Sequence, residues 1–81
     1  MKIIPDKRLF WFLRDDIKLD LSNPSDTDMY IQQVITRGRT EDIKAIFENM
    51  DFTQFKKSFV RLKHFLPWEV RKFWEDAIGN N

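Results

Sequence analysis

DFTQFKKSFVRLKHFLP, residues 51–67, decides the fold that we predict for this chain. Its large apolar residues fall within a sector of about 80° at 100° per residue, which is typical of one face of a helix. These residues are Phe52, Phe55, Phe59, Leu62 and Leu66. Asp51 is suited to cap the first turn, with Gln54 at the capping-box position. Pro67 ends the segment because the residue before a proline avoids helical geometry. The stretch therefore predicts a helix over about residues 52–65.

A further helix follows over about residues 67–78, since Pro67 is favoured at the first helical position and Gly79 at the end. Its inner face is predicted from four apolar residues at helical spacing. They are Val70, Phe73, Trp74 and Ala77. Together with Leu62 and Leu66, we expect these residues to belong to the core.

Two helices precede this pair, over about residues 26–37 and 41–50. Ser25 has the spacing of a capping box, and Gly38 is expected to close the first helix in the left-handed conformation. Thr40 is the predicted N-cap of the second. The two apolar stripes consist of Ile31, Val34 and Ile35, with Tyr30 beside them, and of Ile43, Ile46, Phe47 and Met50.

The N-terminal part predicts a short helix over about residues 6–13, followed by a connecting loop over residues 15–25, where no strand partner is evident. Leu9-Phe10-Trp11-Phe12-Leu13 poses a problem, because five consecutive apolar residues cannot share one helical face. Either the C-terminal helices enclose this segment or part of it docks on another molecule. We predict one domain over residues 1–81, an all-α compact bundle of four main helices with a short N-terminal helical or aromatic segment.

Composition argues against several classes of function. The chain has no cysteine, one histidine and two isolated glycines. It therefore lacks the usual parts of a catalytic nucleophile, a metal cluster and a phosphate-binding loop. We expect no enzymatic activity, cofactor or metal. The longest apolar run, residues 9–13, is too short for a membrane span or a signal peptide, so we expect a cytoplasmic protein that does not bind membranes.

Charge is unevenly distributed. Four basic and one acidic residues lie in 1–14, four and nine in 15–51, and six and three in 52–81. The basic side chains form a candidate nucleic-acid surface, since neutralised phosphates give salt-dependent affinity. They are Arg37, Arg39, Lys56, Lys57, Arg61 and Lys63. The alternative is a solvated face with arginines at a helix end, and we favour that reading. His64 is expected to be a surface residue.

Trp68 is predicted to project away from the inner face of its helix, with Arg71 and Lys72 along its own side. An exposed tryptophan beside arginine matches the composition of protein-interface hot spots. Alternatively, the indole folds back over Leu66 or Phe65. The sequence leaves these two arrangements open.

Three motifs resemble a family of small bacterial helical domains of uncharacterised function. They are LFW at residues 9–11, YIQQVITRGRTEDIKAIF at 30–47 and LKHFLPWEVRKFWEDAIG at 62–79. The pattern has an acidic residue where this chain has Phe12. The matching residues are Phe10, Trp11, Gly38, Phe73 and Trp74, and each is explicable by packing or capping. Such domains often accompany nucleotidyltransferase-type toxins of abortive-infection systems, so the resemblance implies a candidate antitoxin.

From these observations we expect a non-enzymatic protein-interaction domain, whose partner is another protein, such as a neighbouring toxin, or a second copy. The residues predicted to bind protein are Trp68, Arg71, Lys72, Phe10 and Trp11. The alternatives are a small nucleic-acid-binding module that uses the basic faces, and a structural homodimer.

Overall fold

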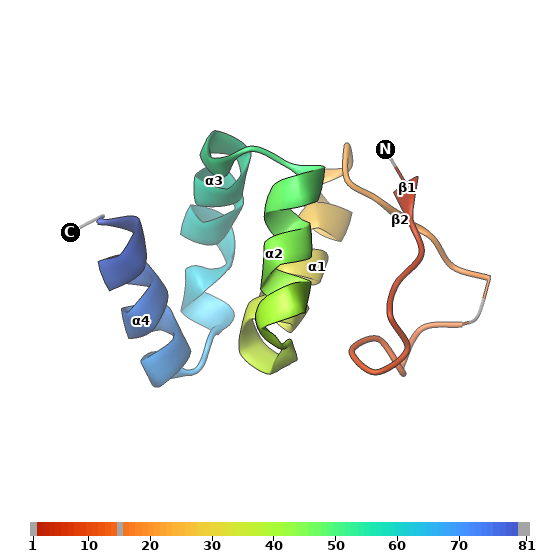
Figure 1. Ribbon diagram of the computed structural model, residues 1–81, viewed down its shortest axis with the longest axis horizontal. Helices are drawn as coiled ribbons and strands as arrows, with labels where there is room; N and C mark the ends of the chain where they lie inside the picture. The colour runs from red at the N-terminus through yellow and green to blue at the C-terminus, as the bar shows by residue number, and fades with distance from the viewer. Residues whose placement is uncertain (1, 15, 80–81) are drawn as a thin grey trace.

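The computed structural model describes residues 2–14 and 16–79, in which four α-helices form an all-α bundle, as predicted. The helices are α1 (Pro24–Arg37), α2 (Thr40–Asn49), α3 (Phe52–Leu62) and α4 (Trp68–Ile78), and the 3-10 turn η1 (Lys63–Phe65) joins the last two. The molecule measures 39 × 22 × 22 Å. Along its long axis, α4 lies at one end and the N-terminal segment at the other (Figure 1).

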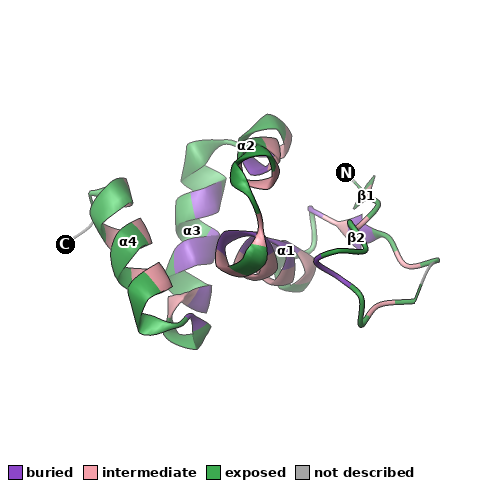
Figure 2. Ribbon diagram, turned by 60° about the horizontal axis from the view of Figure 1, so that its bottom comes forward, coloured by how far each residue is buried: buried purple, intermediate pink, exposed green. Residues whose placement is uncertain are grey.

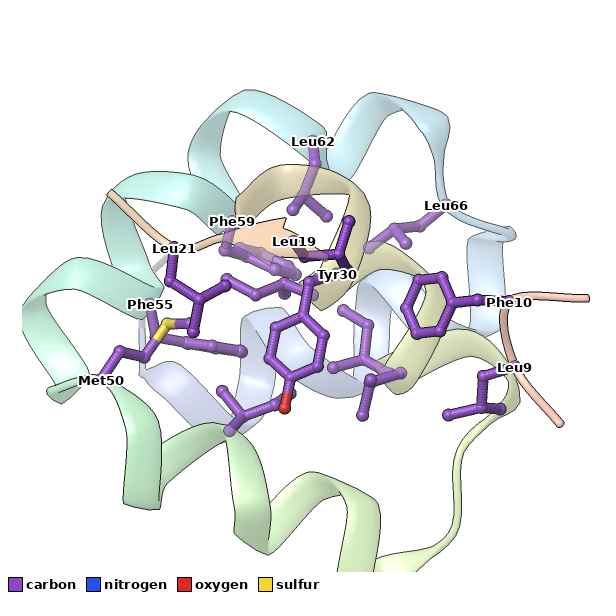
Figure 3. Packing of buried hydrophobic residues seen from close by; sticks show 14 residues of the cluster. Leu9, Phe10, Leu19, Leu21, Tyr30, Met50, Phe55, Phe59, Leu62 and Leu66 are labelled. Carbon is purple, nitrogen blue, oxygen red and sulfur yellow. The ribbon is translucent and has the colours of Figure 1, made fainter. Parts of the chain in front are cut away.

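Helix α1 is the centre of the core and packs against α2, α3 and the N-terminal segment. Its buried apolar residues are Tyr30, Ile31, Val34 and Ile35, as predicted. Side chains from the other elements surround them (Figure 3). They are Leu9, Phe10, Leu19 and Leu21 from the N-terminal segment, and Ile46, Met50, Phe55, Phe59, Leu62 and Leu66 from the rest of the bundle. The core therefore fills the N-terminal and central parts of the molecule.

Two helix starts show the capping chemistry. Asp51 accepts a hydrogen bond from the backbone N–H of Gln54 at 2.8 Å, as the sequence predicts. The prediction for α1 was wrong, because Asn23 and not Ser25 is the N-cap: its Oδ1 accepts from the N–H of Ser25 at 2.9 Å. Pro24 then occupies the first helical position, where its missing N–H costs nothing.

Arg39, not Thr40, is the N-cap position of α2. The stabilising group is the Asp42 carboxylate, which accepts from the backbone N–H of Arg39 at 2.8 Å. The left-handed conformation predicted for Gly38 was also wrong, since its φ of −79° and ψ of 168° are extended. Glycine is needed there for space: a Cβ would lie 2.5 Å from the carbonyl oxygen of Val34.

The helix predicted over residues 6–13 is replaced by two successive turns. The N–H groups of Leu9 and Phe10 both bond the carbonyl oxygen of Asp6 at 2.9 Å, and Leu13 bonds that of Phe10 at 3.0 Å. A continuous helix would spread the five apolar residues around its axis. Two turns instead bury Leu9 and Phe10 and leave Trp11 and Phe12 exposed.

The connector also has a strand partner that the sequence did not reveal. β1 (Lys2–Ile3) pairs antiparallel with β2 (Leu19–Asp20). Leu19, a residue of β2, is buried in the core, so the short sheet fixes the N-terminal segment against the core. Its partner lies at the start of the chain, too far along the sequence for a local pattern to show.

The apolar stripe of α4 is only partly used. Val70, Trp74 and Ile78 are half-buried against the core, whereas Phe73 and Ala77, predicted as core residues, are exposed. None of the residues in α4 is fully buried, and Figure 2 accordingly shows no buried colour on this helix. The turn at η1 places α4 at the edge of the bundle, where it meets one flank of α3 and no further layer covers it.

Candidate functional site

Most of the basic side chains predicted to contact nucleic acid already have partners within the chain. Arg61 forms two hydrogen bonds with Asp28, at 2.8 and 2.9 Å. Lys63 lies 3.4 Å from Glu75. Arg37 lies over the Trp11 ring at 5.4 Å from its centroid, and Lys56 over Phe52 at 5.7 Å. These four cations already have partners within the chain, so they do not form an open row of unpaired charges along which phosphates would lie.

Lys57 and Arg39 are the two members of the predicted nucleic-acid set whose side chains have no ion-pair or ring partner among the described residues. Both are exposed. Lys57 lies on the outer face of α3, and Arg39 lies at the corner between α1 and α2. Two separated cations neutralise few phosphates, so the geometry favours the solvated-face reading.

The N-terminal segment divides into an anchor and an exposed part. Phe10 is 1% exposed, so this residue, predicted to bind protein, is a core residue and is not accessible to a partner. Trp11 and Phe12 are 59% and 52% exposed, with their rings edge to face at a centroid distance of 5.4 Å. This end of the molecule therefore presents two aromatic side chains, one of which is covered on one face by Arg37.

A row of ring contacts connects α2, α3 and α4; we call it the aromatic row. Its members, in order of contact, are Phe52, Phe47, Phe55, Trp74 and Phe73. Phe55 is buried at its centre and lies 5.0 Å from Phe47 and 5.3 Å from Trp74, measured between ring centroids. Phe52 and Phe73, at the two ends, are 48% and 64% exposed.

Trp68 is 68% exposed, which decides between the two arrangements left open by the sequence. Its side chain lies with Arg71, Lys72 and Glu75 around a hollow of about 300 Å³ on the outer side of α4, which we call the Trp68 pocket. Stacking of Arg71 or Lys72 on the indole is not observed, since in the described part of the chain the cations over rings are those on Trp11 and Phe52. The three residues predicted to bind protein on this helix therefore line one open hollow.

Glu75 holds two cations at the edge of the Trp68 pocket. Its Oε2 accepts from Arg71 Nε at 3.3 Å and from Lys63 Nζ at 3.4 Å. Partial burial opposes ionisation of this carboxyl, but the hydrogen bonds from Arg71 and Lys63 outweigh it and hold the pKa of Glu75 below its usual value. Lys72 lies 3.7 Å from Asp76, so each cation around the pocket has a carboxylate partner.

A second hollow, of about 260 Å³, lies between the N-terminal segment and α1 and α2. Its polar groups are the hydroxyl of Tyr30, the amide of Asn49 and the carboxylates of Asp6 and Asp42. Asp42 is already bound by Arg8, at 2.9 Å. The hollow is smaller than a typical ligand pocket and both of its carboxylates are bound by Arg8, so it is the weaker candidate.

Two other kinds of site are absent from residues 2–14 and 16–79. No group of three histidine, cysteine, aspartate or glutamate residues is placed to hold a metal ion. No helix there combines the length and the apolar character needed to cross a membrane.

Sequence reasoning identified Trp68 as a surface residue but missed the exposure of Phe47, Phe52 and Phe73. Each lies at the edge of an apolar stripe, where a helical projection gives only the direction of a side chain. Whether a neighbouring helix covers that edge depends on the crossing of α3 and α4. A signal was present in the number of apolar residues on α4, which exceeds what one flank of a single neighbouring helix can cover.

Comparison of the chain with protein-family models, with curated proteins and with solved structures gives no significant match.

Proposed function

We propose that this chain is a non-enzymatic protein-interaction domain that binds its partner through α4. The observation that carries the proposal is the surface of this helix, which buries none of its own residues although it contains two tryptophans, a phenylalanine, a valine and an isoleucine. Trp68 and Phe73 are exposed on different sides of it. Single exposed apolar residues are ordinary, but large aromatic side chains gathered on one element mark a contact surface.

The mode of action that fits this geometry is steric. Aromatic side chains supply large, stiff contact area, and tryptophan and arginine are the residue types that most often dominate interface energetics. A helix at the end of a 39 Å molecule can enter a groove on a partner while the rest of the bundle stays outside it. If the partner is a toxin, as the family resemblance implies, occupying or covering its active site would keep it inactive.

Binding to nucleic acid is less well supported, because four of the six cations proposed for it are engaged in contacts with Asp28, Glu75, Trp11 and Phe52, and the other two, Arg39 and Lys57, lie apart. A row of partnered cations releases fewer counterions when it binds a polyanion. A low-salt mobility-shift assay with duplex and single-stranded probes should therefore give no shift at micromolar protein.

Co-expression with the products of neighbouring genes tests the proposal. The tagged chain should co-elute with one of them in size-exclusion chromatography with light scattering. Replacing Trp68 and Phe73 by alanine should abolish the complex, whereas Trp11→Ala, a matched exposed tryptophan at the opposite end, should leave it intact. Elution of the wild-type chain alone and monomeric at micromolar concentration with every neighbour would overturn the proposal.

A further inference from the structure

The hollow between the N-terminal segment and helices α1 and α2, which we call the N-terminal hollow, has apolar walls on both sides. Ile3, Leu9 and Phe10 line it from the N-terminal segment, and Val34 and Ala45 line it from the two helices. Its volume of about 260 Å³ is below the range of sites for drug-sized ligands. An engineered apolar cavity of about 150 Å³ is nevertheless large enough to bind benzene. The N-terminal hollow can therefore hold an apolar body of about one ring.

The charged groups of this hollow favour a neutral ligand. Asp6 and Asp42 line it, and Arg8 binds both carboxylates, at 2.8 and 2.9 Å. A cationic ligand would have to compete with this guanidinium, and an anionic ligand would face two carboxylates. Ile4, which also lines the hollow, is 77% exposed, so a neutral molecule can enter from solvent without disturbing the ion pairs.

Two uncharged polar side chains of the hollow have unused hydrogen-bonding capacity. Tyr30 is 7% exposed, and within the described ranges its hydroxyl donates no hydrogen bond. The Asn49 amide donates to the carbonyl oxygen of Ala45 at 2.9 Å, but no donor in the described part of the chain bonds its Oδ1. Buried polar groups nearly always have partners, so a donor and an acceptor left over in one hollow point to a bound molecule.

The state of the phenol supports this use. Burial raises the pKa of Tyr30, the nearby Asn49 amide opposes the shift, and the carboxylates of Asp42 and Glu48 add to it. The hydroxyl therefore stays protonated at neutral pH and remains a donor. The same two carboxylates disfavour a further negative charge beside it.

We propose that the N-terminal hollow binds a small neutral molecule with one apolar ring and one primary amide or hydroxyl group. The carbonyl oxygen of such an amide accepts from Tyr30, and its NH₂ group donates to Asn49 Oδ1; a hydroxyl group does both. A carboxylate has no proton to donate and an ammonium has no lone pair, so each would leave one side chain unpaired. The site is separate from the partner surface proposed on α4, which lies at the opposite end of the molecule (Figure 1).

An NMR titration with four compounds that share one ring tests the proposal. The probes are benzamide and benzyl alcohol, and the matched controls are benzoate and benzylamine. We expect the two neutral compounds to shift the backbone amide signals of Val34 and Ala45 in a saturable way, with millimolar affinity or better. They should also raise the melting temperature, because the walls of the hollow come together only in the folded chain. The two charged compounds should bind about fivefold more weakly or less, since each leaves a buried polar group unpaired.

Variants of the hollow locate the ligand. Tyr30→Phe keeps the ring and removes the donor, so it should weaken benzamide binding about threefold to tenfold. Ala45→Leu should fill the hollow and abolish binding. Ala77→Leu, the same exchange at an exposed position of α4, is the control and should leave the affinity for benzamide unchanged.

Three results would overturn the proposal. Equal affinity for benzamide and benzoate would show that the polar pair does not select the ligand. Binding that Ala45→Leu leaves unchanged would place the ligand outside the hollow. No saturable shift with either neutral compound, up to its solubility limit, would show that the hollow does not accept a ring of this kind.

Discussion

Arg61 of α3 donates two hydrogen bonds to the carboxylate of Asp28 of α1, from Nε to Oδ2 at 2.9 Å and from Nη2 to Oδ1 at 2.8 Å. The same guanidinium also bonds the hydroxyl of the buried Ser58 at 3.0 Å. The hydrogen bonds to Asp28 raise the pKa of Arg61, so this guanidinium stays positively charged. Arg61 was a candidate phosphate ligand because of its place on a helix face. In the structure it instead links α3 to α1 at the centre of the fold.

The ion pair between Arg61 and Asp28 gives the first prediction. Arg61→Ala should lower the free energy of unfolding by about 1 kcal/mol or less, because the pair is bidentate but half exposed to water. Urea denaturation measures the change. Lys57→Ala, an exposed and unpaired position on the same helix, is the control and should change little. A loss that persists unchanged at 1 M salt would show that the contribution of Arg61 is not electrostatic.

A second prediction concerns the buried anchor of the N-terminal segment. Phe10 is 1% exposed and lies stacked on Tyr30 at a centroid distance of 6.4 Å. Phe10→Ala should cost about 3–5 kcal/mol by leaving a cavity in the core. Phe12→Ala, two residues away and 52% exposed, should cost less than about 1 kcal/mol. Similar losses in thermal unfolding would mean that the segment is not divided into an anchor and an exposed part.

The two glycines should respond differently to alanine. At Gly38 the added Cβ meets the Val34 carbonyl oxygen at 2.5 Å, so backbone must move and the loss should be about 1–3 kcal/mol. At Gly79 nothing lies within 4 Å, and the cost is the left-handed strain at φ of 74°, about 1 kcal/mol. Gly79→Asn should recover part of that loss. Asparagine at position 38 should recover none, and recovery there would contradict the crowding.

Acid should weaken the contact between the N-terminal turn and α2. The backbone N–H of Arg39 lowers the pKa of Asp42; partial burial opposes this and the Arg8 guanidinium adds to it. A lowered folded-state pKa means that the stabilisation is complete above the usual value of 3.8 and is lost as pH falls through the folded-state pKa. Asp6 also binds Arg8, and the pKa of Asp6 is likewise below its usual value.

Asp42→Asn separates this contribution from the rest. The variant should be less stable than wild type at pH 7, and the difference should vanish as pH falls through the lowered folded-state pKa of Asp42. Urea unfolding between pH 2.5 and 7 measures both curves. Asp16→Asn is a suitable control, since that carboxylate is paired with Arg14 at 3.4 Å at an exposed site and makes no contact with a helix end. Parallel curves for wild type and Asp42→Asn would contradict the assignment.

Helix α4 should open before the rest of the bundle. It buries no residue fully and is fixed mainly by Trp74 on Phe55 and by Glu75 with Lys63. Amide hydrogen exchange should therefore be faster in α4 than at Ile31 in α1, because few buried contacts resist local opening. Trp74→Ala should accelerate exchange in α4 further and leave α1 unchanged. Equal protection of the two helices would show that α4 belongs to the same cooperative unit.

The sequence by itself determined the number and order of the four helices. Asp51 with Gln54, Pro67 and Gly79 act through contacts a few residues apart, so the break before α4 and two of the caps are readable from local spacing. Pro67 itself is the N-cap position of α4 and not, as predicted, its first helical residue. The stripes of α1 and of α3 from Phe55 to Leu62 are buried as predicted, because helical periodicity fixes which side chains share a face.

The tertiary structure alone decided how far each face is covered. Phe73 has helical spacing with Trp74 and Val70 yet stays exposed, since the angle at η1 sets which flank of α4 meets α3. Arg61 is hydrogen-bonded to Asp28, thirty-three residues away, and Lys2–Ile3 pairs with Leu19–Asp20 across the N-terminal turns. Such contacts join residues that are distant along the chain, and no local pattern encodes their geometry. The Trp68 pocket is intermediate: the spacing along α4 brought its residues together, and the position of α4 at the edge of the bundle left them open.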